Sequence, residues 1–231
     1  MANKDLTIEY RNFFQEIGMK TNNRVFLNGK ITSKDEFDRN ITLIEVSCER
    51  KTAGVFDLIP VRVSNWQIKD FSVDDPVVIL GELRTENYED VSTQKSHKLI
   101  YVSCQVILSE VPADWPKPID SSMIWLYGNI CKLSPKLKEV SRRGSISTRR
   151  LLEGTLAVNS DNTAYIPVVF WQAEAEDIHK NVSERENIFL AGRLQSRLYK
   201  KKGDYEDLAY EVSSIKAKKI TPVAYQAATS S

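Results

Sequence analysis

Two apolar runs enclose a short polar segment between residues 164 and 199, and this stretch decides the fold. The first run is Ala164-Tyr165-Ile166-Pro167-Val168-Val169-Phe170-Trp171, and the second is Phe189-Leu190-Ala191-Gly192-Arg193-Leu194-Gln195-Ser196-Arg197-Leu198-Tyr199. Between them, Gln172-Ala173-Glu174-Ala175-Glu176-Asp177-Ile178 has the composition of a brief helix. The order predicts a strand, a short helix and a second strand whose side chains alternate between two faces.

The same texture of short strand-like runs begins much earlier in the chain. Before residue 109 these runs are 24–31, 41–48, 56–63, 76–85 and 99–107, with a helical interlude at 65–73. Short strands with one brief helix after the third predict a small all-β barrel rather than a parallel sheet. Residues 7–18 have a helical pattern instead, and this helix could pack on its own barrel or contact a partner subunit.

A proline-rich segment divides the strand-like runs into two groups. Pro112, Pro116 and Pro118 disfavour regular strand pairing, so residues 109–121 are expected to be a stiff extended connection. The predicted organisation is therefore an N-terminal extension (1–22), a first barrel (23–108), this connection, a second barrel (122–220) and a tail (221–231). The tail is rich in Ala and Ser and is predicted to be disordered.

Landmarks of the first group recur in the same order in the second. The matched pairs are Gly29 with Gly128, Ile59-Pro60-Val61 with Ile166-Pro167-Val168, Gly81 with Gly192, and Tyr101 with Tyr210. Their separations drift only by loop-sized steps. We therefore predict an internal duplication of the barrel.

The charge is distributed unevenly between the two halves. Residues 1–111 carry 14 Lys and Arg against 17 Asp and Glu, whereas residues 112–231 carry 18 against 14, and the net charge is only +1. The segment 132–154 concentrates seven cations against two acids, and its Ser and Gly residues predict a mobile loop or hairpin arm. A polyanionic partner should therefore prefer the second half, although a merely solvated loop remains the alternative.

Cys48, Cys104 and Cys131 show no metal-binding or redox spacing, and all three fall in strand-like runs. They are expected to be reduced, packed thiols, as is typical of a cytosolic protein. The chain begins without an apolar leader, and no apolar run approaches the roughly 18–20 residues of a membrane span. We expect a cytoplasmic protein.

The strand, helix and strand of residues 164–199, with the run Gly192-Arg193-Leu194, resemble the core of the bacterial single-stranded DNA-binding protein (SSB) family. The resemblance covers residues 122–220 closely and 23–108 weakly. It implies two tandem five-stranded OB barrels that bind single-stranded DNA, with bases stacked on aromatic rings and phosphates held by Lys and Arg. Since members of the family generally use four barrels, it also implies a homodimer.

The resemblance assigns the stacking rings to Tyr165, Trp171 and Tyr199. The phosphate contacts that we predict are Arg193, Arg197, Lys132, Arg142, Arg143, Arg149, Arg150 and Lys200. Arg193, Gln195 and Arg197 should share one face of their strand because side chains alternate with a period of two. For each ring the alternative is a place in the core, and Trp171 could equally close the end of the barrel.

The first group departs from this pattern. Leu58 and Ser64 stand where the second has Tyr165 and Trp171, and Glu82 and Glu86 stand where it has Arg193 and Arg197. Acids would repel phosphate there, so only Tyr88 and Arg84 remain as possible contacts. We expect the first barrel to act mainly as a scaffold or dimerisation unit.

No enzymatic, metal or cofactor site is expected. His97 and His179 stand alone, and Glu174, Glu176 and Asp177 are better explained as a solvated helix face than as a catalytic group. The acidic tip that ends typical family members is missing here. A primosomal-type or protein-interaction OB module with weak or no DNA binding therefore remains the alternative function.

Overall fold

The computed structural model describes residues 22–90, 95–115, 120–142, 145–158, 162–200 and 206–220, without the side chains at 88–90, 95–97, 137–142, 145–147, 198–200 and 206–207. Strands make up most of this part of the chain, together with two short helices. The expected all-β, OB-like class is confirmed. The predicted helix at 7–18 and the predicted disordered tail lie outside the described residues.

The first five strands close into a ring. They are β1 (Asn23–Glu36), β2 (Ile41–Glu49), β3 (Phe56–Ser64), β4 (Pro76–Asp90) and β5 (Lys95–Leu108), and helix α2 (Asn65–Ile68) follows β3. β1 pairs with β2 and with β4, β2 pairs with β3, and β5 pairs with β4 and, in parallel, with β3. Closure of this kind leaves no free sheet edge around the ring.

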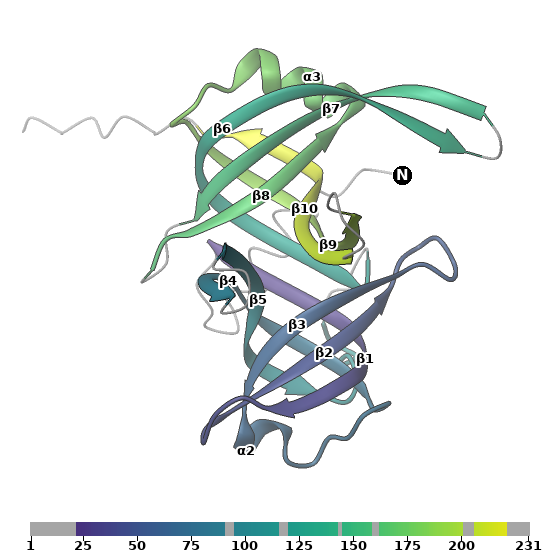
Figure 1. Ribbon diagram of the computed structural model, residues 1–231, viewed down its shortest axis with the longest axis vertical. Helices are drawn as coiled ribbons and strands as arrows, with labels where there is room; N and C mark the ends of the chain where they lie inside the picture. Colours follow the sequence, from purple (N-terminus) through teal and green to yellow (C-terminus); the bar gives the residue numbers. More distant parts are fainter. Residues whose placement is uncertain are drawn as a thin grey trace, which may run out of the picture.

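The second five strands close in the same order. They are β6 (Ser122–Arg142), β7 (Ser145–Val158), β8 (Ala164–Trp171), β9 (Asn187–Lys200) and β10 (Glu206–Lys219), and helix α3 (Gln172–Asn181) follows β8. β6 pairs with β7 and β9, β7 with β8, and β10 with β9 and, in parallel, with β8. Figure 1 shows this ring above the first, with the β6–β7 hairpin extending to one side.

The glycines that mark the repeat occupy matched, crowded positions. A Cβ atom on Gly29 would lie 2.3 Å from the Ser47 carbonyl oxygen, and one on Gly128 would lie 2.3 Å from that of Ala157. Each of these glycines is followed by a bulge, at Ile31–Ser33 in β1 and at Ile130–Lys132 in β6. Because no side chain fits there, glycine lets the two strands approach closely.

The match between Tyr101 and Tyr210 is wrong by one residue. Tyr101 lies opposite Arg84, but Tyr210 lies opposite Ser196, and Glu211 is the residue opposite Gln195. A shift of one position turns a strand side chain to the other face. Accordingly, Tyr210 packs against the core, whereas the Tyr101 ring lies against Arg62 on the outside.

The two rings are also joined directly by strand pairing, which the sequence did not predict. β1 pairs antiparallel with β6 from Asn23↔Leu126 to Leu27↔Ser122, with Val25 opposite Ile124 at the centre. Phe26, Trp125 and Met123 are buried over this seam, and Val111 and Trp115 from the proline-rich connection pack against them. The described residues of that connection, 109–115 and 120–121, contain no strand.

Three predicted segments differ in extent or form from the observed elements. The helical interlude at 65–73 contains a helix only at Asn65–Ile68, and the helix expected at 172–178 continues to Asn181. The segment 132–154 is not a loop, because β6 and β7 continue through it and remain paired as far as Arg142↔Ser145. It forms a long antiparallel hairpin, here called the arm (residues 132–154).

Candidate nucleic-acid interface

Strand β8 presents one face to the barrel interior and the other to the outside. Ile166, Val168 and Phe170 are almost fully buried in the core. Side chains alternate along a strand, so Tyr165 and Trp171 lie on the opposite face, near the two ends of β8. Tyr165 is 49% exposed. Two of the three predicted rings therefore belong to one outer face.

A polar cavity of about 320 Å³ lies on this outer face, between the base of the arm and strand β9. Pro167 and Val169 of β8 line it between the two ring positions. Its charged lining residues are Lys132, Lys136, Glu153, Arg197 and Glu211. The sequence analysis had singled out Lys132 and Arg197, and the structure brings them to the same cavity.

The charges around the cavity are paired across its walls. The Lys136 Nζ lies 2.5 Å from a Glu153 carboxylate oxygen, and the Arg197 guanidinium donates to Glu211 at 2.5 Å. The Lys136 and Arg197 side chains nevertheless remain 53% and 41% exposed. An anionic ligand could therefore reach these cations and take the place of the carboxylates.

The arm carries most of the remaining predicted cations. Arg149 is half-buried, and the exposed Arg150 donates to Glu176 of α3 at 2.6 Å. Arg142 lies at the last described pair of the arm, and Arg143 lies outside the described residues. Tyr199 and Lys200 end β9, beyond the positions whose side chains are described. Figure 1 shows the outer part of the β6–β7 hairpin extending to one side of the barrel.

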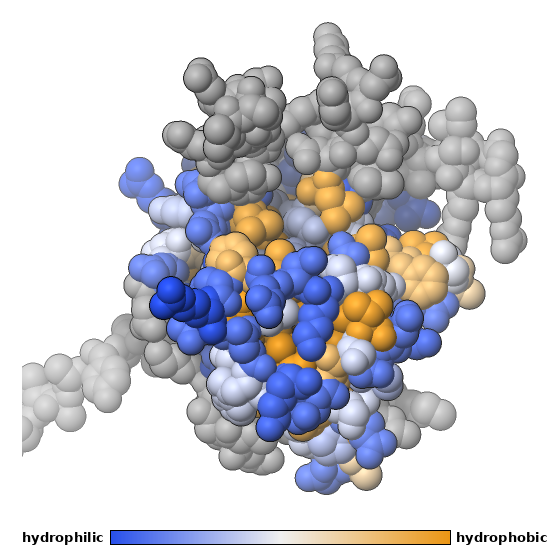
Figure 2. Space-filling model, turned by 60° about the horizontal axis from the view of Figure 1, so that its bottom comes forward, coloured by the Kyte–Doolittle hydropathy of each residue, from blue (hydrophilic) through white to orange (hydrophobic). Residues whose placement is uncertain are grey.

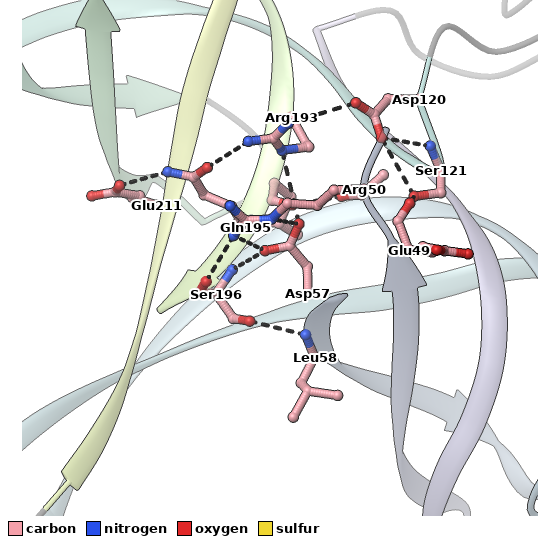
Figure 3. A network of polar contacts seen from close by, with 12 residues as sticks. Glu49, Arg50, Asp57, Leu58, Asp120, Ser121, Arg193, Gln195, Ser196 and Glu211 are labelled. Atoms are coloured by element: carbon pink, nitrogen blue, oxygen red, sulfur yellow. Dashed lines mark hydrogen bonds and ion pairs between the residues drawn. The ribbon is translucent and has the colours of Figure 1, made fainter. Parts of the chain in front are cut away.

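Arg193 lies at the contact between the two barrels (Figure 3). Its Nε lies 3.8 Å from Asp57 and its Nη1 lies 3.6 Å from Asp120. Asp57 is 1% exposed and accepts hydrogen bonds from Nε and Nη2 of Arg50, at 2.9 and 2.6 Å, and from the Ser196 backbone N–H at 2.8 Å. The charge of Arg193 is therefore largely compensated by carboxylates of the inter-barrel contact.

The first barrel adds a cation to the β8 face that the sequence analysis missed. The Lys98 Nζ of β5 lies 5.9 Å from the centroid of the Tyr165 ring and donates to the Tyr165 carbonyl oxygen at 3.4 Å. Lys98 is far from Tyr165 in sequence and has no motif around it. Only the packing of one barrel on the other brings the two together.

The corresponding face of the first barrel is built differently. The Arg62 guanidinium lies between the rings of Phe37 and Tyr101, 4.4 and 4.0 Å from their centroids, and pairs with Glu86 at 2.7 Å. Arg62 occupies the position in the first barrel that corresponds to Val169 of the second barrel. A cation already stacked on both rings leaves these ring faces unavailable for bases.

Glu82 is not the exposed, repelling acid that the sequence suggested. It is 7% exposed and pairs with Arg24 at 2.9 Å and with Arg84 at 2.6 Å. Arg84, one of the two possible first-barrel contacts, is thus engaged within the fold. The other, Tyr88, lies in β4 without a described side chain.

The most exposed large apolar side chain among the described residues is Trp66 of α2, at 72%. Helix α2 lies at the end of the first barrel that Figure 2 brings forward, where apolar groups are interspersed with hydrophilic ones. The neighbours of Trp66 in sequence include Lys69, Asp70, Asp74 and Asp75. The sequence analysis did not single out Trp66, although its place in a short polar segment was a usable signal.

The few perturbed side chains have structural causes. Burial raises the pKa of Glu174 on α3, and a hydrogen bond from Ser214 at 2.8 Å partly offsets this effect. Burial also raises the pKa of Cys48 and of Cys104 to about 12. In the described part of the chain, no group of three or more His, Cys, Asp or Glu is arranged to hold a metal ion.

Comparison with known proteins identifies the fold. The structure is similar to the wild-type single-stranded DNA-binding protein of Thermus aquaticus, with a TM-score of 0.63 and 18% sequence identity over 89% of this chain and 96% of that one. A deletion variant of the same protein gives a TM-score of 0.62 and 17% identity over 86% and 94%. Both neighbours are DNA-binding proteins rather than enzymes. At this identity the likeness establishes an SSB-like OB fold.

Neither sequence comparison adds to this result. No family model matches the chain, and no curated protein matches it. None of the described helices is long and apolar enough to cross a membrane.

Proposed function

We propose that this protein binds single-stranded DNA without strong sequence preference, through the outer face of its second barrel. The observation that carries the proposal is the polar cavity bordered by Lys132, Lys136 and Arg197, with Tyr165 and Trp171 on the same strand face. Aromatic rings stack on any base, and cations in a groove hold the phosphates, so the combination gives sequence-tolerant binding. The structural likeness to the Thermus aquaticus protein supports the same function.

In this proposal the residues divide into two groups. Tyr165, Trp171 and Tyr199 stack on bases. The cations that hold phosphates are Lys132, Arg197, Arg149, Arg150, Arg142, Arg143 and Lys200. Arg193 contributes less to phosphate binding, because Asp57 and Asp120 already compensate its charge. The process served would be DNA replication, recombination or repair.

We also infer that the chain is a tandem OB protein produced by duplication, with the second barrel dominating DNA binding. The matched glycines and bulges support the duplication. The Arg62 stack in the first barrel supports the asymmetry, since it covers one face of each of the two rings that could otherwise receive bases. A homodimer would then supply four barrels.

The test is titration with oligo-dT at several salt concentrations. Tyr165→Ala should weaken binding by about 1–3 kcal/mol with little change in salt slope, because stacking releases no counterions. Arg149→Ala with Arg150→Ala should instead flatten the slope by about 1.4, since each lost phosphate contact on a single strand contributes about 0.7. Tyr127→Ala, at an exposed tyrosine outside the lining of the cavity, is the control.

Equal salt slopes in both variants would contradict the division of labour. Failure of the unmodified protein to bind oligo-dT at low salt would refute the function itself. In that case a protein-interaction role is the second candidate. The 72% exposure of Trp66 is the observation that favours it, because a large exposed apolar side chain is typical of protein-interaction surfaces.

A further inference from the structure

A second cavity lies on the other side of the arm, where the arm passes helix α3. Its volume is about 300 Å³. Leu151, Leu152 and Ala175 provide apolar walls, and the polar side chains that also line it are Lys136, Arg150, Glu176 and His179. Leu151, Leu152 and Ala175 are each at most 4% exposed, whereas the side chain of Arg150 is 63% exposed. The cavity thus combines buried apolar walls with accessible cations.

This cavity continues the outer-face cavity already described. Lys136 lines both. The register places Leu151 directly opposite Trp171, the ring that ends β8. Single-stranded DNA bound along the outer face of β8 would therefore reach the second cavity just beyond Trp171.

The first barrel has a different set of bonds at the corresponding place. There the turn after β1 is tied to the start of α2: the Asn65 N–H donates to the Asn40 carbonyl at 2.9 Å, and its Nδ2 donates to that of Arg39 at 3.2 Å. Thr42 Oγ1 also donates to Asn65 Oδ1 at 2.7 Å.

The second barrel differs in both of the elements concerned. α3 has 10 residues where α2 has 4. The arm remains paired to Arg142↔Ser145, whereas β1 and β2 remain paired only to Glu36↔Thr42. The longer helix and the longer hairpin both line the cavity, and both belong to the barrel with the basic face.

We infer that this cavity accepts one base of the bound single strand, with the adjoining phosphates on Lys136 and Arg150. The inference rests on the proposed function and extends its site around the arm. Ligand cavities begin at about 300 Å³, so this one suits a single small planar group. Apolar walls receive the face of any base, and Lys136 and Arg150 can exchange Glu153 and Glu176 for phosphates.

Filling the cavity tests the inference. Ala175 lines it, so Ala175→Leu places additional carbons in the space that the base would occupy. The matched control is Ala173→Leu, the same change on the same helix at an exposed position outside the cavity lining. Loss of one stacked base should weaken oligo-dT binding about fivefold to hundredfold in Ala175→Leu. Ala173→Leu should bind as the unmodified protein does.

The outcomes separate this inference from the proposed function. If the unmodified protein does not bind oligo-dT, the proposed function fails. If it binds and folded Ala175→Leu binds equally well, the inference alone fails. If Ala175→Leu keeps its DNA affinity but changes the mass measured by light scattering, the cavity holds part of a second copy, and the inference is again overturned.

A photocrosslink gives an answer that does not depend on the folding of a variant. Oligo-dT carrying iododeoxyuridine at one position is irradiated with the unmodified protein, and the crosslinked peptide is identified by mass spectrometry. We expect crosslinks at His179 of α3 as well as on the β8 face. Crosslinks confined to the β8 face would overturn the inference.

Discussion

Removing the Asp57 carboxylate tests the polar contact between the two barrels, which acts beside the β1–β6 pairing. In Asp57→Ala, Arg50 loses its hydrogen-bond acceptor, Arg193 loses an ion-pair partner, and the Ser196 backbone N–H loses its acceptor across the interface. Asp57 is 1% exposed, so water does not replace it in the folded protein without rearrangement. The contact should be weakened strongly.

The magnitude follows from the burial of the partners. Breaking a buried ion pair costs about 3–5 kcal/mol, because the remaining charge is left without compensation. The Arg50 and Arg193 side chains are each 23% exposed and can regain part of their hydration, which places the cost at the lower end. We expect a loss of about 3 kcal/mol, and a melting temperature lowered by about 6–12 °C for a chain of this size.

The assay is equilibrium unfolding in urea, followed by circular dichroism and tryptophan fluorescence. The control is Asp70→Ala, since Asp70 is 81% exposed and lies 3.9 Å from Lys69. This change should alter stability by less than about 0.5 kcal/mol. A loss below about 1 kcal/mol in Asp57→Ala would show that the network positions the barrels without stabilising them.

Two further predictions concern buried groups. Burial raises the pKa of Cys48 and Cys104 to about 12, so only the exposed Cys131 should react rapidly with a thiol reagent at pH 8. All three thiols should react in denaturant. Rapid reaction of two thiols in the folded protein would contradict this prediction. Because burial raises the pKa of Glu174 above 4.5, the folded state binds the proton of this carboxyl group more tightly than the unfolded state does. The stability that protonated Glu174 contributes to the fold is therefore full below pH 4.5 and is lost as the pH rises through the raised pKa. Glu174→Gln should remove this part of the pH dependence in urea unfolding measured across that window, and an unchanged profile would exclude Glu174 as its source.

Local patterns predicted much of the fold. The alternation of apolar residues gave the strands, because a half-buried strand requires a period of two. The repeated glycines gave the matched positions, since each meets a backbone carbonyl that excludes a side chain. Tyr101 and Tyr210 were mismatched because a spacing argument does not resolve a shift of one residue, although that shift reverses the face.

The candidate site was only partly predictable. A motif or a charge cluster singled out Tyr165, Trp171, Lys132 and Arg197, and the structure places them on or beside the outer face of β8. Lys98 was missed because its place beside Tyr165 depends on how the barrels meet, which no local pattern encodes. Arg193 shows the converse, since its motif suggested a phosphate contact and the fold surrounds it with Asp57 and Asp120.

The seam between β1 and β6 has the geometry of a two-fold symmetric pair. Gly29 matches Gly128, and with the same spacing Val25 matches Ile124, the residue that it faces at the centre of the seam. The flanking bonds follow the same symmetry: the Asn28 N–H donates to the Ser121 carbonyl and the Tyr127 N–H donates to that of Asn22, at 2.7 and 2.8 Å. Equivalent groups therefore meet each other, as they do when two identical subunits associate around a two-fold axis.

Joining both partners in one chain changes what controls their association. Two separate barrels would meet at a rate and to an extent set by their concentration, whereas barrels in one polypeptide experience a fixed, high effective concentration. Dilution therefore does not separate this pair. The spacing and orientation of the two outer faces stay constant even when the protein is scarce in the cell.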